Sequence, residues 1–253
     1  MKQLNVTLSQ CEVNAFTAAA VKQCDRLDGL KDGIISHPAY CEFDAHALVG
    51  SNFTCDGEQR AFTKAGAKVV EAAWSGFNSS EISWPGVEIG ADLTESLIVT
   101  ECAEGDVACS STSLWTSMLA SFVVADPDFD PSTLSTEEFS HLLVKSVAMW
   151  RSKLGSANPR LHRFQEAGGK LITWHGMADT TIPPKNTEKY YNDVLKHNDN
   201  VSDFFRYFEV PGVGHCSGGE GPLPNVALEQ LMAWVENKTA PVTLEASSAR
   251  TGL

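Results

Sequence analysis

Two segments in the C-terminal part of the chain each place an acid–base side chain shortly after a strand-like run. Asp179 follows the apolar run 170–174, and His215 follows the aromatic-rich run 204–210. A histidine can take a proton near neutral pH, and a carboxylate beside it orients the ring and stabilises its charged form. Taken singly, Asp179 has an ordinary explanation as a cap of the next helix, and His215 as a hydrogen-bonded loop histidine. Taken together, the two favour a general base with its orienting acid.

An acid and then a histidine, each after a strand, match the second half of an α/β-hydrolase triad, whose chain order is Ser, Asp or Glu, His. The serine of such a triad lies upstream of both, on a sharp turn with the pattern G-x-S-x-G. No such pattern occurs in this chain. Ser217 is not assigned as the nucleophile, because it shares the loop of His215 and no strand precedes it. His175 is expected to be a buried, hydrogen-bonded histidine rather than a base.

Helices and strands alternate around these loops. Five elements are expected, in the order helix, strand, helix, strand, helix: residues 159–167, 170–174, 183–196, 204–210 and 226–235. Gly168 ends the first helix because glycine is a preferred C-terminal cap, and Pro183-Pro184 opens the second because proline is tolerated in a first turn. The order predicts a parallel sheet with crossover helices. Residues 156–238 are therefore expected to form the C-terminal part of an incomplete α/β-hydrolase core, and 239–253 a loose tail.

A second group of chemically active residues lies near the N-terminus. Asp25, Asp28 and Asp32 are interrupted by glycines, so the loop turns sharply and gathers carboxylates that repel one another unless a cation neutralises them. Hard oxygen ligands in a flexible loop favour Ca²⁺, with the carbonyls of Leu30 and Ile34 completing the set. The alternative is a polar surface turn, since Asp-Gly is an ordinary turn former. The spacing alone leaves both open.

Composition restricts the class of protein. The formal net charge of −13 argues against nucleic acid or an anionic membrane as a partner, and no apolar run is long enough to span a bilayer. The seven cysteines show neither a CxxC pair nor a Cys/His zinc spacing, which favours disulfides in an oxidising compartment. Five N-x-S/T sequons agree with a secreted glycoprotein: Asn5, Asn52, Asn78, Asn200 and Asn237. The first residues lack the apolar segment of a signal peptide, so a truncated chain is expected.

Three blocks of sequence together resemble the tannase/feruloyl esterase family. They are CDRLDGLKDGIISHPAYCEFD, GGKLITWHGMADTTIPP and VPGVGHCSGG. The resemblance implies secreted serine esterases with an α/β-hydrolase core and a lid inserted between the nucleophile and the acid. Residues 1–155 are then the lid region. It also implies a structural Ca²⁺ site in that region, with ligands on these positions: Asp25, Asp28, Leu30, Asp32 and Ile34.

The same resemblance bears on the cysteines. In the family, the cysteine before the nucleophilic serine is bonded to the cysteine after the histidine, which here is Cys216, so its partner is expected upstream and missing. Cys24 and Cys41 flank the acidic loop, and a bridge between them would make it rigid. Cys102 and Cys109 are a close pair, and Cys11 and Cys55 are paired by elimination.

The expected function is that of a carboxylic ester hydrolase acting on small phenolic-acid esters, with Asp179 and His215 in the triad. Without the serine, the chain is expected to be inactive alone. The alternative is a secreted, calcium-stabilised glycoprotein without catalysis, either vestigial or a binding protein. Tryptophans either line a pocket for an aromatic acid or pack in the interior: Trp74, Trp84, Trp115 and Trp150.

Overall fold

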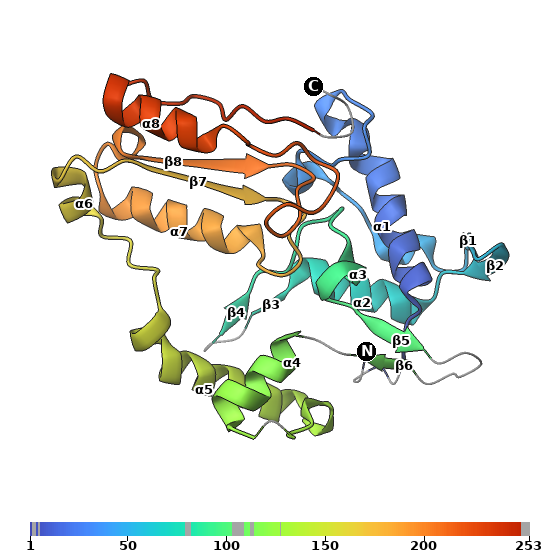
Figure 1. The fold of residues 1–253 in the computed structure, drawn as a ribbon. Coiled ribbons are helices and arrows are strands. Elements are labelled where there is room, and N and C mark those ends of the chain that lie inside the picture. Colours follow the sequence, from blue (N-terminus) through green and yellow to red (C-terminus); the bar gives the residue numbers. More distant parts are fainter. Residues whose placement is uncertain are drawn as a thin grey trace. The chain divides into compact units, whose positions relative to one another are not determined.

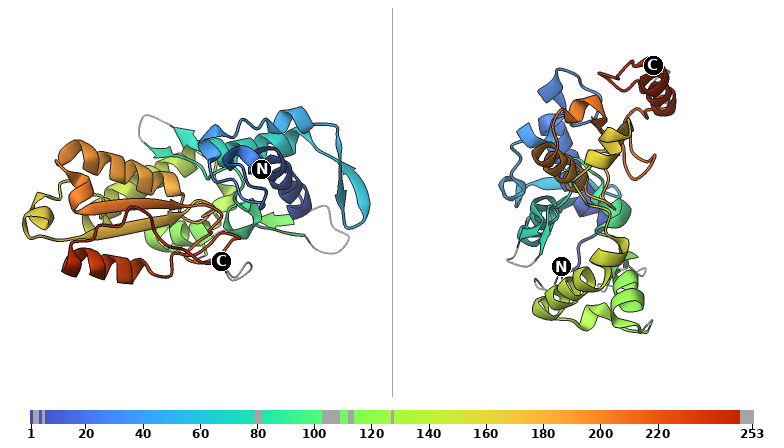
Figure 2. Two further views of the ribbon diagram at one scale, coloured as in Figure 1. Left: turned by 90° about the horizontal axis from the view of Figure 1, so that it is seen from above. Right: turned by 90° about the vertical axis from the view of Figure 1, so that its left-hand side faces the viewer.

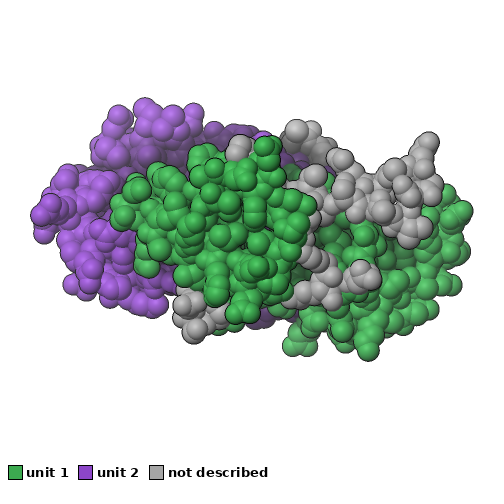
Figure 3. Space-filling model, turned by 90° about the horizontal axis from the view of Figure 1, so that it is seen from below, with its two compact units in different colours: residues 1–20, 42–86, 92–156 green, residues 21–41, 87–91, 157–253 purple. Residues whose placement is uncertain are grey.

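The fold is described from a computed structural model. It describes residues 1, 4, 6–78, 82–102, 109–111, 114–126 and 128–248, without the side chains of residues 101, 102, 109–111, 114–116 and 132. The chain divides into two compact units, shown in green and purple in Figure 3: residues 1–20, 42–86 and 92–156 in unit 1, and residues 21–41, 87–91 and 157–253 in unit 2. The acidic loop at 25–34, grouped with the lid region from sequence, thus falls in the same unit as the C-terminal α/β elements.

Unit 2 is built on two parallel strands. Its elements are η2 (Asp25–Asp28), η3 (Pro38–Tyr40), α6 (His162–Glu166), β7 (Leu171–Gly176), α7 (Pro184–His197), η7 (Val201–Asp203), β8 (Phe205–Val210) and α8 (Ala227–Asn237). β7 and β8 pair in parallel, from Leu171 opposite Phe205 to Gly176 opposite Val210. The connection between them contains α7, and α7 and α8 lie on opposite faces of the strand pair (Figure 1, Figure 2). The parallel arrangement with a crossover helix is confirmed.

Aromatic and branched side chains hold α7 against the strands. Val194, Phe204 and Phe205 are at most 1% exposed and form a core cluster with Val201. The ring of Tyr191 packs edge-on against that of Phe205, with 5.0 Å between the centroids. Burying side chains of this size supplies most of the stabilisation that such a layer has. This core lies at the beginning of the two strands, where Leu171 pairs with Phe205, and Asp179 and His215 follow the opposite ends of the strands.

The segment that follows α8 is held in place, which differs from the loose tail expected. Leu223 and Ser247 form a two-residue antiparallel bridge. The side chain of Gln230, on α8, donates to the carbonyl of Thr243 at 2.9 Å and accepts from the N–H of Glu245 at 3.1 Å. One side chain thus satisfies backbone groups on a stretch that has no regular structure of its own. Residues 249–253 lie outside the described part of the chain.

Unit 1 contains helices and short antiparallel strand pairs. Its elements are α1 (Gln10–Cys24, which continues into unit 2), η4 (Ala45–Leu48), β1 (Asn52–Cys55), β2 (Glu58–Ala61), α2 (Lys64–Ser75), β3 (Phe77–Asn78), β4 (Ser83–Trp84), α3 (Leu93–Ser96), β5 (Thr100–Cys102), β6 (Cys109–Ser111), α4 (Leu114–Leu119), the π-helical turn η5 (Ala120–Val124), η6 (Pro131–Thr133) and α5 (Thr136–Leu154). Glu12 is 8% exposed, and its Oε1 accepts from both the N–H and the hydroxyl of Thr63, each at 2.8 Å. Thr63 in turn caps α2. None of the helices in the described residues is long and apolar enough to cross a membrane.

Candidate active site

The loop after β7 carries Asp179, whose carboxylate is fixed by the backbone that follows it. Asp179 is 3% exposed. Its Oδ1 accepts hydrogen bonds from the N–H groups of Thr181, at 2.9 Å, and Ile182, at 2.8 Å. An aspartate that binds the amides two and three residues further on closes a tight turn. The turn holds the carboxylate in one orientation. The amides of Thr181 and Ile182 bond to Oδ1, so Oδ2 is left for other partners.

His215 lies on the loop after β8, and its ring meets Asp179. Nδ1 of His215 is 3.0 Å from Oδ2 of Asp179. Because an ionised carboxylate only accepts, Nδ1 carries the hydrogen and Nε2 of the neutral ring holds the lone pair. The side chain of His215 is 45% exposed, whereas that of Asp179 is 4% exposed. A buried carboxylate thus orients an imidazole that can take a proton at its other nitrogen.

Backbone hydrogen bonds join the two loops directly. The N–H of Met177 donates to the carbonyl of Val210, and the N–H of Ala178 donates to that of Val213, both at 2.9 Å. The histidine loop closes on itself through the antiparallel bridge between Val213 and Gly219. The acid and the histidine therefore meet because continuous backbone bonding extends the β7–β8 pair past the strand ends.

His175, the residue before the end of β7, belongs to the same network. Its Nε2 is 3.2 Å from Oδ2 of Asp179 and 2.9 Å from the carbonyl oxygen of Ile182. Its Nδ1 is 2.8 Å from the hydroxyl of Thr187 on α7. The sequence predicts a buried, hydrogen-bonded histidine here; the ring is hydrogen-bonded as predicted, but it is only partly buried, with 14% of the side chain exposed. Its contact with Asp179 carries no spacing signal and was missed.

Within the described part of the chain, no serine hydroxyl hydrogen-bonds to His215. Ser217 donates its backbone N–H to the carbonyl of His215 at 2.7 Å, which places it in the turn of the same loop. Cys216 stands between them with a positive φ of 60°. The structure brings Asp179 and His215 together, and in the described residues no serine hydroxyl hydrogen-bonds to this histidine.

The acidic loop is organised by its own carboxylates. Oδ1 of Asp25 accepts from the N–H groups of Asp32, at 3.1 Å, and Gly33, at 2.9 Å, which closes the loop. Oδ1 of Asp28 accepts from the N–H of Leu30 at 2.8 Å, and this hydrogen bond, helped by one from Ser36, lowers the pKa of Asp28. Oδ1 of Asp32 accepts from the N–H of Ile34 at 3.0 Å.

These residues suit a cation chemically but are not gathered around one point. All five expected donors are hard oxygens, as Ca²⁺ prefers. The hydrogen bonds above use Oδ1 of each aspartate, and a carboxylate can also bind a cation through its second oxygen. Across the described residues, no three His, Cys, Asp or Glu side chains are grouped so as to hold a metal ion.

Two disulfides are present among the described residues. Cys24 and Cys41 are joined across the acidic loop, and Cys11 and Cys55 join α1 to β1. Both are pairings expected from the sequence. Cys102 and Cys109 lie opposite each other in the β5–β6 pair, but their side chains lie outside the described residues, so their bridge stays a prediction. Cys216 is a free thiol and is exposed.

Several carboxylates lie near the β8–α7 face of unit 2. Burial raises the pKa of Glu88, although Lys185 lies 3.5 Å from its carboxylate and works in the opposite direction. Burial and the nearby charge of Glu188 raise the pKa of Glu209. Burial, followed by the charge of Glu209, also raises the pKa of Tyr207. The three shifts thus share burial as their main cause, and the negative charge of neighbouring carboxylates adds to it.

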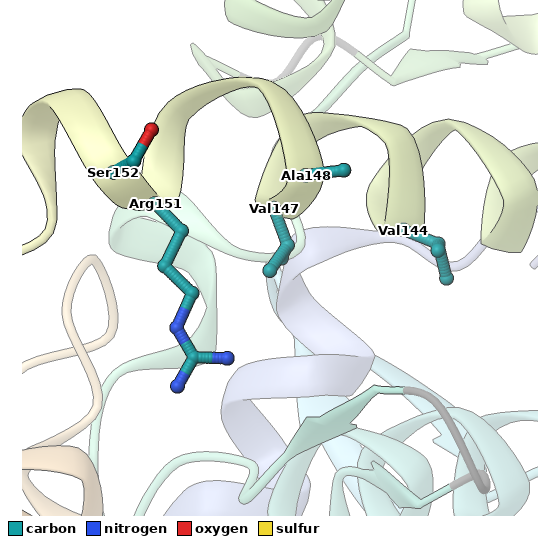
Figure 4. Close-up of a pocket in the computed structure, with 5 residues that line it drawn as sticks. All are labelled: Val144, Val147, Ala148, Arg151 and Ser152. Carbon is teal, nitrogen blue, oxygen red and sulfur yellow. The ribbon is translucent and has the colours of Figure 1, made fainter.

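The tryptophans with described side chains show packing roles. Trp74 is 7% exposed and meets Phe43 edge-on, and Trp150 donates from Nε1 to the carbonyl of Phe122 at 3.1 Å. Trp84 is half-buried, and the side chain of Trp115 lies outside the described residues. A pocket on α5 is lined by three apolar and two polar residues (Figure 4): Val144, Val147, Ala148, Arg151 and Ser152. It contains no aromatic ring and no acid–base pair.

The sequence matches one known protein family and several of its members. The family described as "Tannase and feruloyl esterase" matches residues 1–253. A "Probable feruloyl esterase" of Arthroderma benhamiae is 32% identical over 255 residues, which cover 98% of this chain and 47% of that protein. A "Probable feruloyl esterase B-2" of Aspergillus fumigatus is 28% identical over 256 residues, covering 92% of this chain and 46% of that protein. The chain thus spans about half the length of these relatives.

Solved structures share the fold. A tannin acyl hydrolase from Aspergillus niger superposes with a TM-score of 0.85 at 22% identity, over 100% of this chain and 51% of that one. Feruloyl esterase B from Aspergillus oryzae gives a TM-score of 0.78 at 22% identity, over 98% of this chain and 51% of that one. These likenesses support the α/β-hydrolase type of fold that the strand order predicts.

Proposed function

Because the chain belongs to the tannase and feruloyl esterase family, we propose that Asp179 and His215 are the acid and the base of a carboxylic ester hydrolase. The observation that carries the proposal is the 3.0 Å contact between Nδ1 of His215 and Oδ2 of the buried Asp179. The names of the relatives favour esters of phenolic acids, such as feruloyl or galloyl esters, as the substrate class.

The pair supplies the proton transfers of acyl transfer. Nε2 of His215 removes the proton of a serine hydroxyl while the serine oxygen bonds to the ester carbonyl carbon. Asp179 stabilises the imidazolium that forms. His215 then gives the proton to the leaving alkoxide as the ester C–O bond breaks, which leaves an acyl-serine. Water repeats the cycle with the same base, so that the carboxylic acid and the free serine are released.

The nucleophilic serine of this proposal comes from outside the sequence given. Support comes from the lack of a G-x-S-x-G pattern and from the match to only about half of each relative. The exposed thiol of Cys216, next to His215, suits a disulfide to a cysteine beside that serine. The 253-residue chain alone should then lack ester hydrolysis, because an acid–base pair activates a nucleophile but does not replace it.

The function is tested by measuring hydrolysis of methyl ferulate and methyl gallate by two proteins. One is the chain alone, and the other joins it to a serine-bearing segment of the family. We expect turnover only in the second, and we expect His215→Ala to lower its kcat by several orders of magnitude. His162→Ala, in the exposed α6, is the matched control. Turnover by the chain alone, or an unaffected His215→Ala protein, would refute the assignment.

A second candidate is a secreted, calcium-stabilised protein without catalysis, vestigial or binding. It is favoured by the one observation that the described residues place no serine on His215. The two candidates differ in the joined protein of the preceding experiment. If that protein is folded, forms the Cys216 disulfide and still leaves both esters intact, the non-catalytic candidate is the better one.

Calcium is also part of the proposal. We propose that Asp25, Asp28 and Asp32, with the carbonyls of Leu30 and Ile34, bind one structural Ca²⁺. The hard oxygen donors of the loop support it, and binding would have to draw together carboxylates that the described residues do not gather around one point. The ion would neutralise mutually repelling carboxylates, and it takes no part in the proton transfers above.

Secretion and glycosylation complete the proposal. Two disulfides are typical of an oxidising compartment. Three sequon asparagines, Asn52, Asn200 and Asn237, are exposed, as is the hydroxyl-bearing residue of each sequon. Asn78 is exposed too, whereas Asn5 lies outside the described residues. A glycan at the exposed positions would face solvent without displacing packed side chains.

A further inference from the structure

We propose that His175 is a positioning residue for the acid–base pair: it clamps the loop of Asp179 so that Oδ2 stays on Nδ1 of His215. The geometry of the clamp stands by itself. Only the description of the pair as catalytic rests on the proposed function.

The hydrogens of the His175 ring follow from its neighbours. Nε2 faces two acceptors, the carbonyl of Ile182 at 2.9 Å and Oδ2 of Asp179 at 3.2 Å. Neither group can donate, so Nε2 carries a hydrogen. In the neutral ring Nδ1 is then an acceptor, and the hydroxyl of Thr187, at 2.8 Å, donates to it.

This arrangement fixes the turn from Asp179 to Ile182 at its first and its last residue. Ile182 donates its N–H to Oδ1 of Asp179 at 2.8 Å, while its carbonyl accepts from His175. The ring therefore holds the last residue of the turn and the second carboxylate oxygen at once. His175 itself is anchored by β7 on one side and by Thr187 of α7 on the other. A residue that is itself held in place, as His175 is, preserves the angle at which the carboxylate of Asp179 meets His215.

Oδ2 of Asp179 thus contacts two imidazoles, that of His175 near the end of β7 and that of His215 on the loop after β8. His215, the more exposed of the two, is the one able to exchange protons with a substrate. His175 has both nitrogens engaged with protein groups and is 14% exposed. Without the N–H of His175, the carbonyl of Ile182 would lose its hydrogen-bond donor, and the turn at Asp179 would become less rigid. The effect would reach His215 through Asp179.

A spectroscopic signature separates positioning from mere packing. The proton between Nδ1 of His215 and Oδ2 of the buried Asp179 is expected to resonate well downfield of the backbone amides, and this contact needs neither substrate nor serine. The experiment records this proton in the purified chain and assigns it by its loss in His215→Ala. The test variants are His175→Leu, which removes both polar nitrogens, and Thr187→Val, which removes only the hydroxyl. His197→Leu, an exposed histidine that contacts the carbonyl of Asp193, is the matched control.

We expect the downfield resonance to be lost or exchange-broadened in His175→Leu, weakened in Thr187→Val, restored in Thr187→Ser, and unchanged in His197→Leu. If His175→Leu does not fold, the Thr187 pair decides. An unchanged resonance in folded His175→Leu or in Thr187→Val overturns the proposal, as does its absence in the unmodified folded chain. Loss of ester turnover in the joined protein has no bearing on this resonance, so the two proposals fail separately.

Discussion

Gly176, the last residue of β7, lies directly against the backbone carbonyl of Val213 in the histidine loop. A Cβ at position 176 would collide with that carbonyl. Two residues on, the N–H of Ala178 donates to the same carbonyl at 2.9 Å. The distance between the acid loop and the histidine loop is therefore set by a residue without a side chain.

Gly176→Ala should separate the two loops. We expect a loss of roughly 1–3 kcal/mol in the free energy of unfolding, as for other overpacked sites, measured by guanidinium denaturation. Gly168→Ala is the control, because its position has a φ of +76° but open space around it. There only left-handed strain of about 1–2 kcal/mol is expected. The downfield Asp179–His215 proton should be lost in Gly176→Ala and kept in Gly168→Ala. If both variants keep the Asp179–His215 proton, the close approach of Gly176 to Val213 is not needed to hold the two loops together.

Asp179→Asn should keep the fold but misdirect His215. The amide can still accept from the N–H of Thr181 or Ile182, but its NH₂ group would face Nδ1 and favour the wrong tautomer. In the joined, serine-bearing protein we expect kcat to fall by about 10⁴-fold, as in other triads. Steady-state kinetics on methyl ferulate measure this, with Asp199→Asn in an exposed loop as the control. A kcat within a few-fold of the unmodified protein would exclude Asp179 from the triad.

Calcium should bind to the acidic loop and depend on Asp28. Calorimetric titration of the metal-stripped chain with Ca²⁺ should show one site, and Asp28→Ala should weaken it strongly because it loses a charged ligand. Asp44→Ala changes an aspartate that caps η4 in unit 1 and is the control. Equal affinities in the unmodified and Asp28→Ala chains would exclude the proposed ligand set.

The bridge between Cys24 and Cys41 should stabilise the chain. It closes a loop with a sequence separation of 17, for which the chain-entropy model gives about 3 kcal/mol. Unfolding of the Cys24→Ala/Cys41→Ala double variant, followed in EDTA to exclude calcium, measures the loss. Cys216→Ser, which removes an unbridged thiol, should leave the stability nearly unchanged. A double variant as stable as Cys216→Ser would contradict the expectation.

Glu209 should make the fold more stable in acid than at neutral pH. Its pKa is raised in the folded chain, so the folded state binds the proton more tightly than the unfolded state does. That contribution is complete below the ordinary value of 4.5 and is lost as the pH rises through the raised pKa. Glu209→Gln should therefore be the more stable protein at pH 7, with the advantage vanishing near pH 4. Thermal unfolding across this range, with Glu229→Gln on α8 as the control, measures it. An advantage independent of pH would point to a cause other than titration.

The C-terminal elements could be predicted because their signals are local. The apolar run before His175, the prolines that open α7 and the aromatic run of β8 each indicate one element. The acid and the histidine could be paired because parallel strands end at the same edge of a sheet. The contact of His175 with Asp179 and Ile182 depends on the side-chain direction at the strand end, which no spacing encodes.

The helices of unit 1 were not anticipated, although one left a readable signal. Ser135 and Glu138 form a capping box at the start of α5, which the sequence already contains as S-x-x-E. None of the described residues of α5 is buried, so apolar periodicity gave little indication of it. Similarly, residues 239–248 are anchored by the side chain of Gln230 and by the bridge between Leu223 and Ser247, and neither follows from a local sequence pattern.

The acid and the histidine are joined by a short stretch of chain, with a sequence separation of 36, and both loops grow from one strand–helix–strand unit. Contacts between nearby parts of a chain cost little loop-closure entropy and tend to form early in folding. The contact between Asp179 and His215 can therefore form on the timescale of a local supersecondary unit. Under the proposed function, a serine from outside this sequence would then meet a histidine that is already oriented.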